Sequence, residues 1–261
     1  MTDAHLHLQF EEVVPFHDEI FRLYSKLGIK RVVTNGTEPA DWPAVEMLAR
    51  ERACVIPSFG LHPWDVNEAP EEWEKMLGEF LDRHPLAGVG ECGMDSWVRD
   101  HDLDRQEAAF RVQIRLATEG NRALSVHGLK CWGRMLEVLK SERLPERGFL
   151  LHAYGGPVEM VGPFAALGAF FSFNGSFLAE KKASKRDAFA SVPPDRFLIE
   201  TDAPAMPLPA ALSEYALATT VEDSDNHPAN LVVTYREAER VFGITPETAN
   251  ENFERFFGVR T

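Results

Sequence analysis

Short apolar runs alternate along this chain with longer segments of helical periodicity. Apolar residues in the longer segments recur every three or four positions, which predicts helices packed against a sheet; one such set is Phe16, Ile20, Leu23 and Leu27. Several of the short runs are continuously apolar, as is typical of strands buried on both faces. We expect eight strands, at residues 2–8, 31–35, 53–60, 86–90, 122–127, 148–152, 169–173 and 196–200.

This alternation of strand and helix predicts an α/β fold built on a parallel sheet. Eight strand–helix units favour a closed (β/α)8 TIM barrel, and an open doubly wound sheet is the alternative. The 261 residues match the roughly 250 residues of one such barrel and contain no evident linker or repeat, so residues 1–261 are expected to form one domain. Residues 203–230 are rich in Pro, Ala, Ser and Asp, and we expect an ordered loop there over the active rim.

Five of the expected strands end at, or directly before, residues that can bind a divalent metal. These residues are His5, His7, Glu91, His127, His152 and Asp202. In a parallel barrel the carboxyl ends of all strands meet at one rim, so residues far apart in sequence can share one site. The pattern therefore predicts a metal site at the C-terminal rim of the strands.

Each of these residues has a simpler interpretation when it is taken alone. An isolated histidine at a strand end is more often a hydrogen-bonded core residue than a ligand. Glu91 could cap a helix or form an ion pair, and Asp202 could form a turn before a proline. Glu200 shares strand parity with Asp202 and is its local rival, and Asp95 is a weaker acidic candidate.

Taken together, four histidines and two carboxylates suit a pair of divalent ions. Ions about 3.5–4 Å apart would share a water and lower its pKa towards about 7. We expect the two oxygens of Glu91 to bridge the ions, and Asp202 to bind metal and take the proton from the attacking water. His62 also ends a strand and is expected to contact substrate. Rival mechanisms have little support, because the sequence contains no G-x-S-x-G elbow, no P-loop and no G-x-G-x-x-G after a strand.

The charge and cysteine content limit the class of protein. With 27 basic and 41 acidic residues, the net charge of −14 should repel anionic membranes and nucleic acid at long range, although a bound metal would invert the charge locally.

Three cysteines without a C-x-x-C pair indicate reduced thiols. We find no secretory signal and no apolar stretch of about 18 residues, and therefore expect a cytoplasmic protein with no membrane segment. No long exposed apolar stripe is evident, which favours a monomer.

A series of short motifs along essentially the whole chain is specific when its members are taken jointly. The motifs include Asp3-Ala4-His5-Leu6-His7-Leu8, Gly60-Leu61-His62-Pro63, Gly90-Glu91-Cys92-Gly93-Met94-Asp95, Val126-His127, His152-Ala153-Tyr154-Gly155-Gly156, Glu200-Thr201-Asp202-Ala203-Pro204 and Pro228-Ala229-Asn230-Leu231. In their order and intervals the chain resembles the TatD-type metal-dependent hydrolases, within the amidohydrolase-like TIM barrels. Members of that family are usually described as metal-dependent deoxyribonucleases or phosphodiesterases. The resemblance implies a (β/α)8 barrel with one or two divalent ions, either Mg, Mn or Zn.

The resemblance also implies a role for each matching residue. His5 and His7 would hold the first ion, Glu91 would bridge, and His127 and His152 would hold the second ion. Asp202 would complete the first site and activate water.

The chain departs from the family pattern where phosphate contacts are expected. Leu129 stands where the family commonly has an arginine, and Lys130 follows it as a candidate phosphate contact. Tyr154 and Gly155 stand where Phe and Ser are usual, and Tyr154 is included among the expected substrate contacts.

Three hypotheses follow from these patterns. The leading one is a metal-dependent hydrolase of phosphoester bonds, a phosphodiesterase or exonuclease-like deoxyribonuclease with DNA as substrate. The net charge and Leu129 motivate the alternative, a hydrolase of amide or other ester bonds in small molecules. That class often bridges its metals with a carboxylated lysine, whereas Glu91 ends the fourth strand here. The third hypothesis is a metal-binding scaffold without catalysis.

Overall fold

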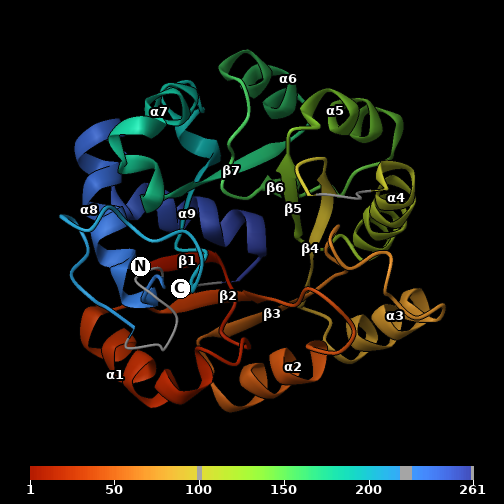
Figure 1. The fold of residues 1–261 in the computed structure, drawn as a ribbon, viewed down its shortest axis with the longest axis horizontal. Coiled ribbons are helices and arrows are strands. Elements are labelled where there is room, and N and C mark those ends of the chain that lie inside the picture. Colours follow the sequence, from red (N-terminus) through yellow and green to blue (C-terminus); the bar gives the residue numbers. More distant parts are fainter. Residues whose placement is uncertain (99–101, 218–224, 260–261) are drawn as a thin grey trace.

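Eight parallel strands form the centre of the molecule. The computed structural model describes residues 1–98, 102–217 and 225–259. Its strands pair in sequence order, which confirms the predicted (β/α)8 TIM barrel (Figure 1). They are β1 (Thr2–Leu6), β2 (Arg31–Asn35), β3 (Val55–Phe59), β4 (Gly88–Asp95), β5 (Leu124–Leu129), β6 (Phe149–Leu151), β7 (Ala169–Asn174) and β8 (Phe197–Glu200).

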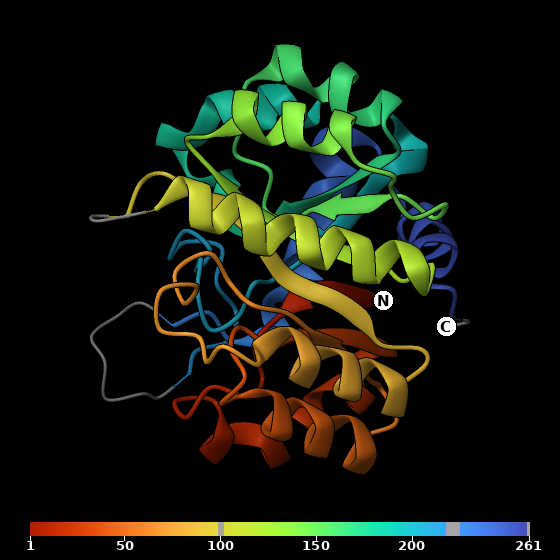
Figure 2. The same cartoon turned by 90° about the vertical axis from the view of Figure 1, so that its right-hand side faces the viewer.

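Helices surround this sheet on the outside, as the two perpendicular views show (Figures 1 and 2). They are α1 (His17–Leu27), α2 (Trp42–Glu51), α3 (Trp73–Arg83), α4 (Leu103–Glu119), α5 (Trp132–Ser141), α6 (Val161–Ala166), α7 (Ala183–Phe189), α8 (Leu231–Phe242) and α9 (Pro246–Phe257). The periodicity that predicted helices corresponds to burial, since Ile20 of α1 lies in the core. Every helix in the described ranges is too short or too polar to cross a membrane.

The barrel closes between its last and first strands through a few specific hydrogen bonds. The backbone N–H of Asp202 donates to the His5 carbonyl at 2.9 Å, and that of His7 donates to the Ala203 carbonyl at 2.8 Å. The buried Asp3 carboxyl also accepts the Thr201 N–H at 3.0 Å and the Thr201 hydroxyl at 2.6 Å. These contacts bring both ends of the sheet, and the residues at those ends, to one place.

Helix α9 covers the end of the barrel where the strands begin. Its Phe253, Phe256 and Phe257 pack against interior residues of the strands in a separate apolar cluster. The Asn252 side-chain amide donates to the Phe197 carbonyl at the start of β8, at 2.8 Å. Since this end is filled, the functional cavity must lie at the opposite, C-terminal rim.

The expected end of the fourth strand is wrong. We placed it at Gly90, whereas β4 continues through Glu91 to Asp95 and pairs with β5 over that extra length. The extension, Glu91-Cys92-Gly93-Met94-Asp95, begins and ends in a carboxylate and contains a glycine, so it lacks the continuous apolar run that marks a strand. Gly93 is required there, because a Cβ at its φ of 140° would lie 2.1 Å from the His127 carbonyl oxygen. Glu91 therefore sits within the strand, on the barrel interior.

Candidate metal centre and its cavity

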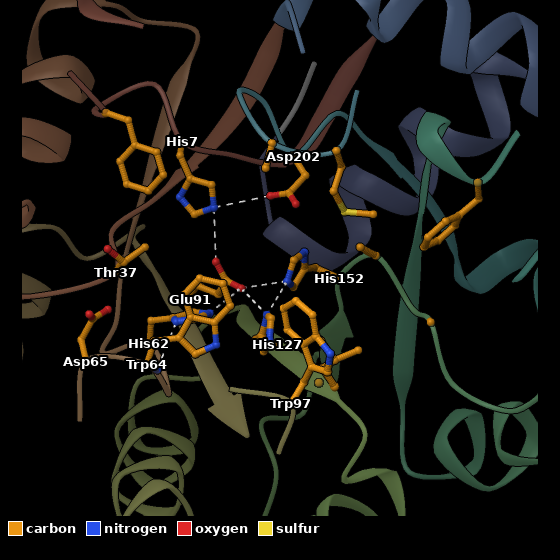
Figure 3. Close-up of a pocket in the computed structure, with 18 of the residues that line it drawn as sticks. His7, Thr37, His62, Trp64, Asp65, Glu91, Trp97, His127, His152 and Asp202 are labelled. Atoms are coloured by element: carbon orange, nitrogen blue, oxygen red, sulfur yellow. Dashed lines mark hydrogen bonds and ion pairs between the residues drawn. The ribbon is translucent and has the colours of Figure 1, made fainter. Parts of the chain in front are cut away.

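Four side-chain atoms converge at the mouth of the barrel, from β1 and the residue directly after it, from β4, and from the residues that follow β8. Figure 3 shows three of these side chains, those of His7, Glu91 and Asp202. Glu91 Oε2 lies 3.2 Å from both His5 Nε2 and His7 Nε2, and the two nitrogens are 3.3 Å apart. Asp202 Oδ1 lies 3.5 Å from His7 Nε2 and 3.8 Å from His5 Nε2. All four residues are buried. They form the first ligand group.

The spacing of this first group suits a metal ion. A tetrahedral Zn²⁺ with bonds of about 2.0–2.1 Å has ligand atoms about 3.3–3.4 Å apart. The observed separations of 3.2–3.8 Å bracket that value. Two imidazoles and two carboxylates are also a donor set that Zn, Mn or Mg accepts. The residues therefore fit a divalent ion, and their identity alone does not select one metal.

Hydrogen bonds behind the histidines fix which ring nitrogen faces this group. His7 Nδ1 lies 2.8 Å from the Asn35 carbonyl, which only accepts, so Nδ1 must carry the hydrogen. His5 Nδ1 lies 2.9 Å from the Ser125 hydroxyl. The Nε2 of His7 is thereby turned to the centre, and Ser125 can hold His5 in the same way. Such outer partners orient metal-binding histidines in proteins.

The other oxygen of Glu91 faces a second ligand group. Glu91 Oε1 lies 2.8 Å from His152 Nε2 and 3.0 Å from His127 Nδ1, and these two nitrogens are 3.4 Å apart. Asp95 Oδ2 lies 3.0 Å from His127 Nε2. Glu200 lies behind His152, with Oε1 3.7 Å from Nδ1, and is bonded by strand β7 residues. Asp95 and Glu200 thus support histidines from outside the centre.

His62 differs from the other histidines at this centre. Its Nε2 lies 3.4 Å from Glu91 Oε1, but its Nδ1 accepts the backbone N–H of Trp64 at 3.3 Å. Burial lowers the pKa of His62 and keeps the ring neutral, so the hydrogen must sit on Nε2. This ring therefore presents an N–H donor to the centre, and a metal would require the other tautomer.

Opposing charges shift the pKa values across the centre. Burial alone would raise the pKa of Glu91, but the surrounding histidines, His152 first, hold it well below its usual range. Burial alone would lower the pKa of His7, yet bonds to Asp202 and Glu91 raise it to about 10. Burial and the neighbouring His152 lower the pKa of His5 to about 4. The Glu91 carboxylate is therefore ionised and can bind a cation. A bound cation would displace a proton from His7.

A cavity of about 580 Å³ opens above the two ligand groups. Its walls carry several aromatic and apolar side chains, namely Phe10, Trp64, Trp97, Leu129, Phe177 and Met206, beside the polar Thr37, His62, Asp65 and Lys185. Ala205 and Met206 come from the 203–230 loop that we expected over the rim. Within that loop, residues 218–224 lie outside the described part of the chain.

All six residues expected to bind metal come together at this rim, whereas two of the expected substrate contacts do not line the cavity. Tyr154 was wrongly placed: it is 0% exposed, and its hydroxyl donates to the Pro157 carbonyl at 2.7 Å within the core. The exposed Lys130 lies outside the lining, with Nζ 5.9 Å from the Trp97 ring centroid. His62 does line the cavity.

Sequence reasoning missed several of the cavity's side chains. Trp64 follows Gly60-Leu61-His62-Pro63 directly, and this adjacency was a usable signal. No sequence signal marked Trp97 or Lys185, because each lies in a segment whose position over the rim depends on the fold.

Comparison with known proteins identifies relatives along almost the entire chain. A family model described as TatD related DNase matches residues 2–258. YjjV of Escherichia coli K12, named as an uncharacterized metal-dependent hydrolase, is 26% identical over 79% of this chain and 80% of its own. A protein of Citrobacter koseri named 3′-5′ ssDNA/RNA exonuclease TatD is 25% identical over 99% of both chains.

The fold is shared as well. The crystal structure of YjjV from E. coli K12 superposes with a TM-score of 0.89 at 22% sequence identity, covering 99% of this chain and 98% of that one. Because the family model spans residues 2–258 and the barrel agrees, this chain belongs to the TatD-related DNase family of metal-dependent hydrolases.

Proposed function

We propose that the protein hydrolyses phosphodiester bonds at the end of a nucleic acid strand, with residues 1–261 acting as one catalytic domain. One observation carries the proposal: the two oxygens of the buried Glu91 face two separate groups of ligand atoms. This arrangement suits a pair of ions, which is a common device for displacement at phosphorus. Relatives named as 3′-5′ ssDNA/RNA exonucleases support the choice of substrate.

Each residue of the centre has a distinct task in this proposal. His5, His7 and Asp202 would hold one ion, His127 and His152 the other, and Glu91 would contact both. When bound, the ions supply positive charge that acidifies water and stabilises negative charge on phosphoryl oxygens. Asp202 accepts the proton of the attacking water in this proposal. Burial alone would raise its pKa, but its bond to His7 and the neighbouring histidines lower that pKa and keep the group ionised. The carboxylate is therefore free to act as a base at neutral pH.

The remaining polar groups of the cavity would handle the substrate. His62 presents its Nε2–H beside Glu91 and can donate to a phosphoryl oxygen or to the departing oxygen. Lys185 also lines the cavity and offers one positive charge. The small number of cations keeps hydrolysis of a small-molecule ester or amide as the second candidate.

Cleavage by metal-loaded protein tests the proposal. The protein is stripped with a chelator, reloaded with Mn, Mg or Zn, and incubated with short single-stranded DNA that is labelled at either end. We expect metal-dependent release of mononucleotides from the 3′ end, and none after chelation. A strand whose 3′-terminal linkage is a phosphorothioate, which resists cleavage while the 3′ hydroxyl stays free, serves as the substrate control.

Parallel assays separate the rival functions. A panel of amide and carboxylic ester substrates is tested with the same metal-loaded protein. Turnover of that panel without any cleavage of DNA would refute the nuclease proposal and leave the hydrolase class intact. Absence of turnover on every substrate, with both metals bound, would favour the non-catalytic scaffold.

A further inference from the structure

Two large aromatic side chains stand exposed at the cavity beside the metal ligands. Trp64 is 52% exposed and Trp97 is 60% exposed, and both line the cavity. In the view of Figure 3 they lie on the same side as His127, across from His7 and Asp202. Exposed apolar groups gathered at a concave site mark a binding surface in soluble proteins.

One carboxylate holds both tryptophans in place. Asp95 Oδ2 accepts the Trp64 indole N–H at 2.8 Å, and Asp95 Oδ1 accepts the Trp97 backbone N–H at 2.7 Å. The same buried side chain contacts His127 Nε2 at 3.0 Å. The Trp64 ring centroid consequently lies 6.2 Å from that of His127. The Trp64 indole and the Trp97 backbone are therefore held relative to the metal centre, so a group bound on the Trp64 ring would lie at a set distance from the reacting bond.

The cavity offers little positive charge for a nucleic acid backbone. Among the described residues that line it, Lys185 is the single lysine or arginine, and its ammonium already donates to the Gly155 carbonyl. Lys130 lies over the Trp97 ring and not in the lining. The chain as a whole carries a net charge of −14. A long polyanion would gain little from this surface, whereas a planar uncharged group would gain from the indoles.

We propose that Trp64 and Trp97 form an aromatic platform that stacks on the nucleobase of the substrate's terminal nucleotide. The platform, not contact with successive phosphates, then provides most of the substrate affinity and sets a short substrate footprint. This inference rests on the proposed nuclease function, since it assigns a base-binding surface to that site. Bases stack on aromatic side chains without strong sequence preference, so any terminal base would be accepted.

Paired substrates test the platform. One is a dinucleotide with a 3′-terminal adenine, and the other has a 3′-terminal abasic residue. Alanine substitution of a stacking residue typically costs about 1–3 kcal/mol per base, which is about a 5- to 150-fold change in affinity. We expect wild-type KM to be lower for the adenine substrate by a factor in that range. Trp64→Ala and Trp97→Ala should each reduce this preference at least fivefold and leave the abasic KM within about twofold.

Matched variants separate stacking from loss of structure. Trp97→Phe keeps an aromatic face and should retain most of the preference, and Trp64→Phe keeps the face but loses the bond to Asp95. Met47→Ala removes an exposed apolar side chain of α2 and should change nothing. Metal content and melting temperature are measured for each variant. A preference that survives in either tryptophan-to-alanine variant would overturn the platform.

A binding assay distinguishes failure of the platform from failure of the proposed function. Deoxyadenosine monophosphate and abasic deoxyribose phosphate are titrated calorimetrically into the metal-loaded protein. If the tryptophan variants weaken binding of the first ligand alone, the platform stands even where no phosphodiester is cleaved. If deoxyadenosine monophosphate does not bind, or if both tryptophan variants bind it as tightly as the wild type does, the platform is wrong even where cleavage occurs.

Salt dependence tests the short footprint independently. Each phosphate contact to a single strand contributes a slope of about −0.7 in log affinity against log salt. For a six-nucleotide strand binding to Asp202→Asn protein, we expect a slope no steeper than about −1.4, equivalent to two contacts. A slope of about −2 or steeper would indicate that the protein tracks the backbone and would overturn the inference.

Discussion

Replacement of Asp202 by asparagine should abolish most turnover while leaving the fold intact. Asp202 has a left-handed backbone, with φ of 53°, and asparagine is one of the few residues that adopts this conformation readily. Its backbone N–H, which donates to the His5 carbonyl across the barrel closure, is unchanged by the substitution. The variant therefore removes one negative charge, one proton acceptor and one carboxylate of the first ligand group, and leaves the backbone arrangement in place.

The expected loss follows from the role of the lost carboxylate. A positioned general base contributes about 10²–10⁴-fold to rate, so kcat should fall by that factor, or about 3–5 kcal/mol in activation free energy. Asp202→Ala should lose as much activity and also be strained, because alanine in the left-handed region costs about 1–2 kcal/mol. For a chain of this size that strain lowers the melting temperature by about 2–8 °C relative to asparagine.

The assay measures kcat at saturating metal and compares the melting temperatures of the two variants in chelator. Metal analysis must show equal loading before the rates are compared. An Asp202→Asn protein that binds metal fully and keeps kcat within tenfold of wild type would refute the assignment of Asp202 as the base. Equal melting temperatures for the two variants would refute the backbone argument separately.

Three further substitutions probe the support of the site and its electrostatics. Ser125→Ala removes the partner of His5 Nδ1 and should weaken metal affinity about 10- to 100-fold, measured by competition with a chelator. Burial raises the pKa of Asp65 from 3.8 to about 6, so the folded protein binds the extra proton and stability falls as pH rises through that window. Asp65→Asn should then stabilise the metal-free protein by up to about 3 kcal/mol above pH 6 and have no effect below pH 4, as measured by urea unfolding. Gly93→Ala should cost about 3 kcal/mol or more, since its Cβ would meet the His127 carbonyl.

Each of these substitutions has a matched control. Gly78→Ala lies in α3 with nothing within 4 Å of the added Cβ and should stabilise by about 0.4–1 kcal/mol. Asp187→Asn makes the same change of charge at an exposed carboxylate of α7 and is the control for Asp65→Asn. Ser213→Ala removes an exposed hydroxyl that is hydrogen-bonded to Tyr215 and Asn230 and to none of the ligand residues, and should leave metal affinity unchanged. A variant that behaved like its control would contradict the corresponding argument.

The sequence was sufficient for the fold class because the signals involved are local. A continuously apolar strand and a helix with one apolar face are visible as periodicities within a few residues. The same reasoning failed for the far half of β4, where Glu91, Gly93 and Asp95 interrupt the apolar run and packing against β5 decides the strand. The family motifs, which are patterns of residue type and interval, identified the chain's relatives for a similar reason.

What the sequence by itself determined was the set of residues at the strand ends, and with it the six candidate ligands. The sequence also led us to expect that Glu91 bridges two ions, which agrees with the oxygen that it turns to each ligand group. Only the tertiary structure decided that His62 carries its hydrogen towards these groups. The structure also shows that Tyr154 is buried in the core and that Trp97 lies in the cavity wall. These outcomes depend on side-chain direction and on distances across a closed barrel, which are fixed by packing between segments remote in sequence. No local periodicity encodes them.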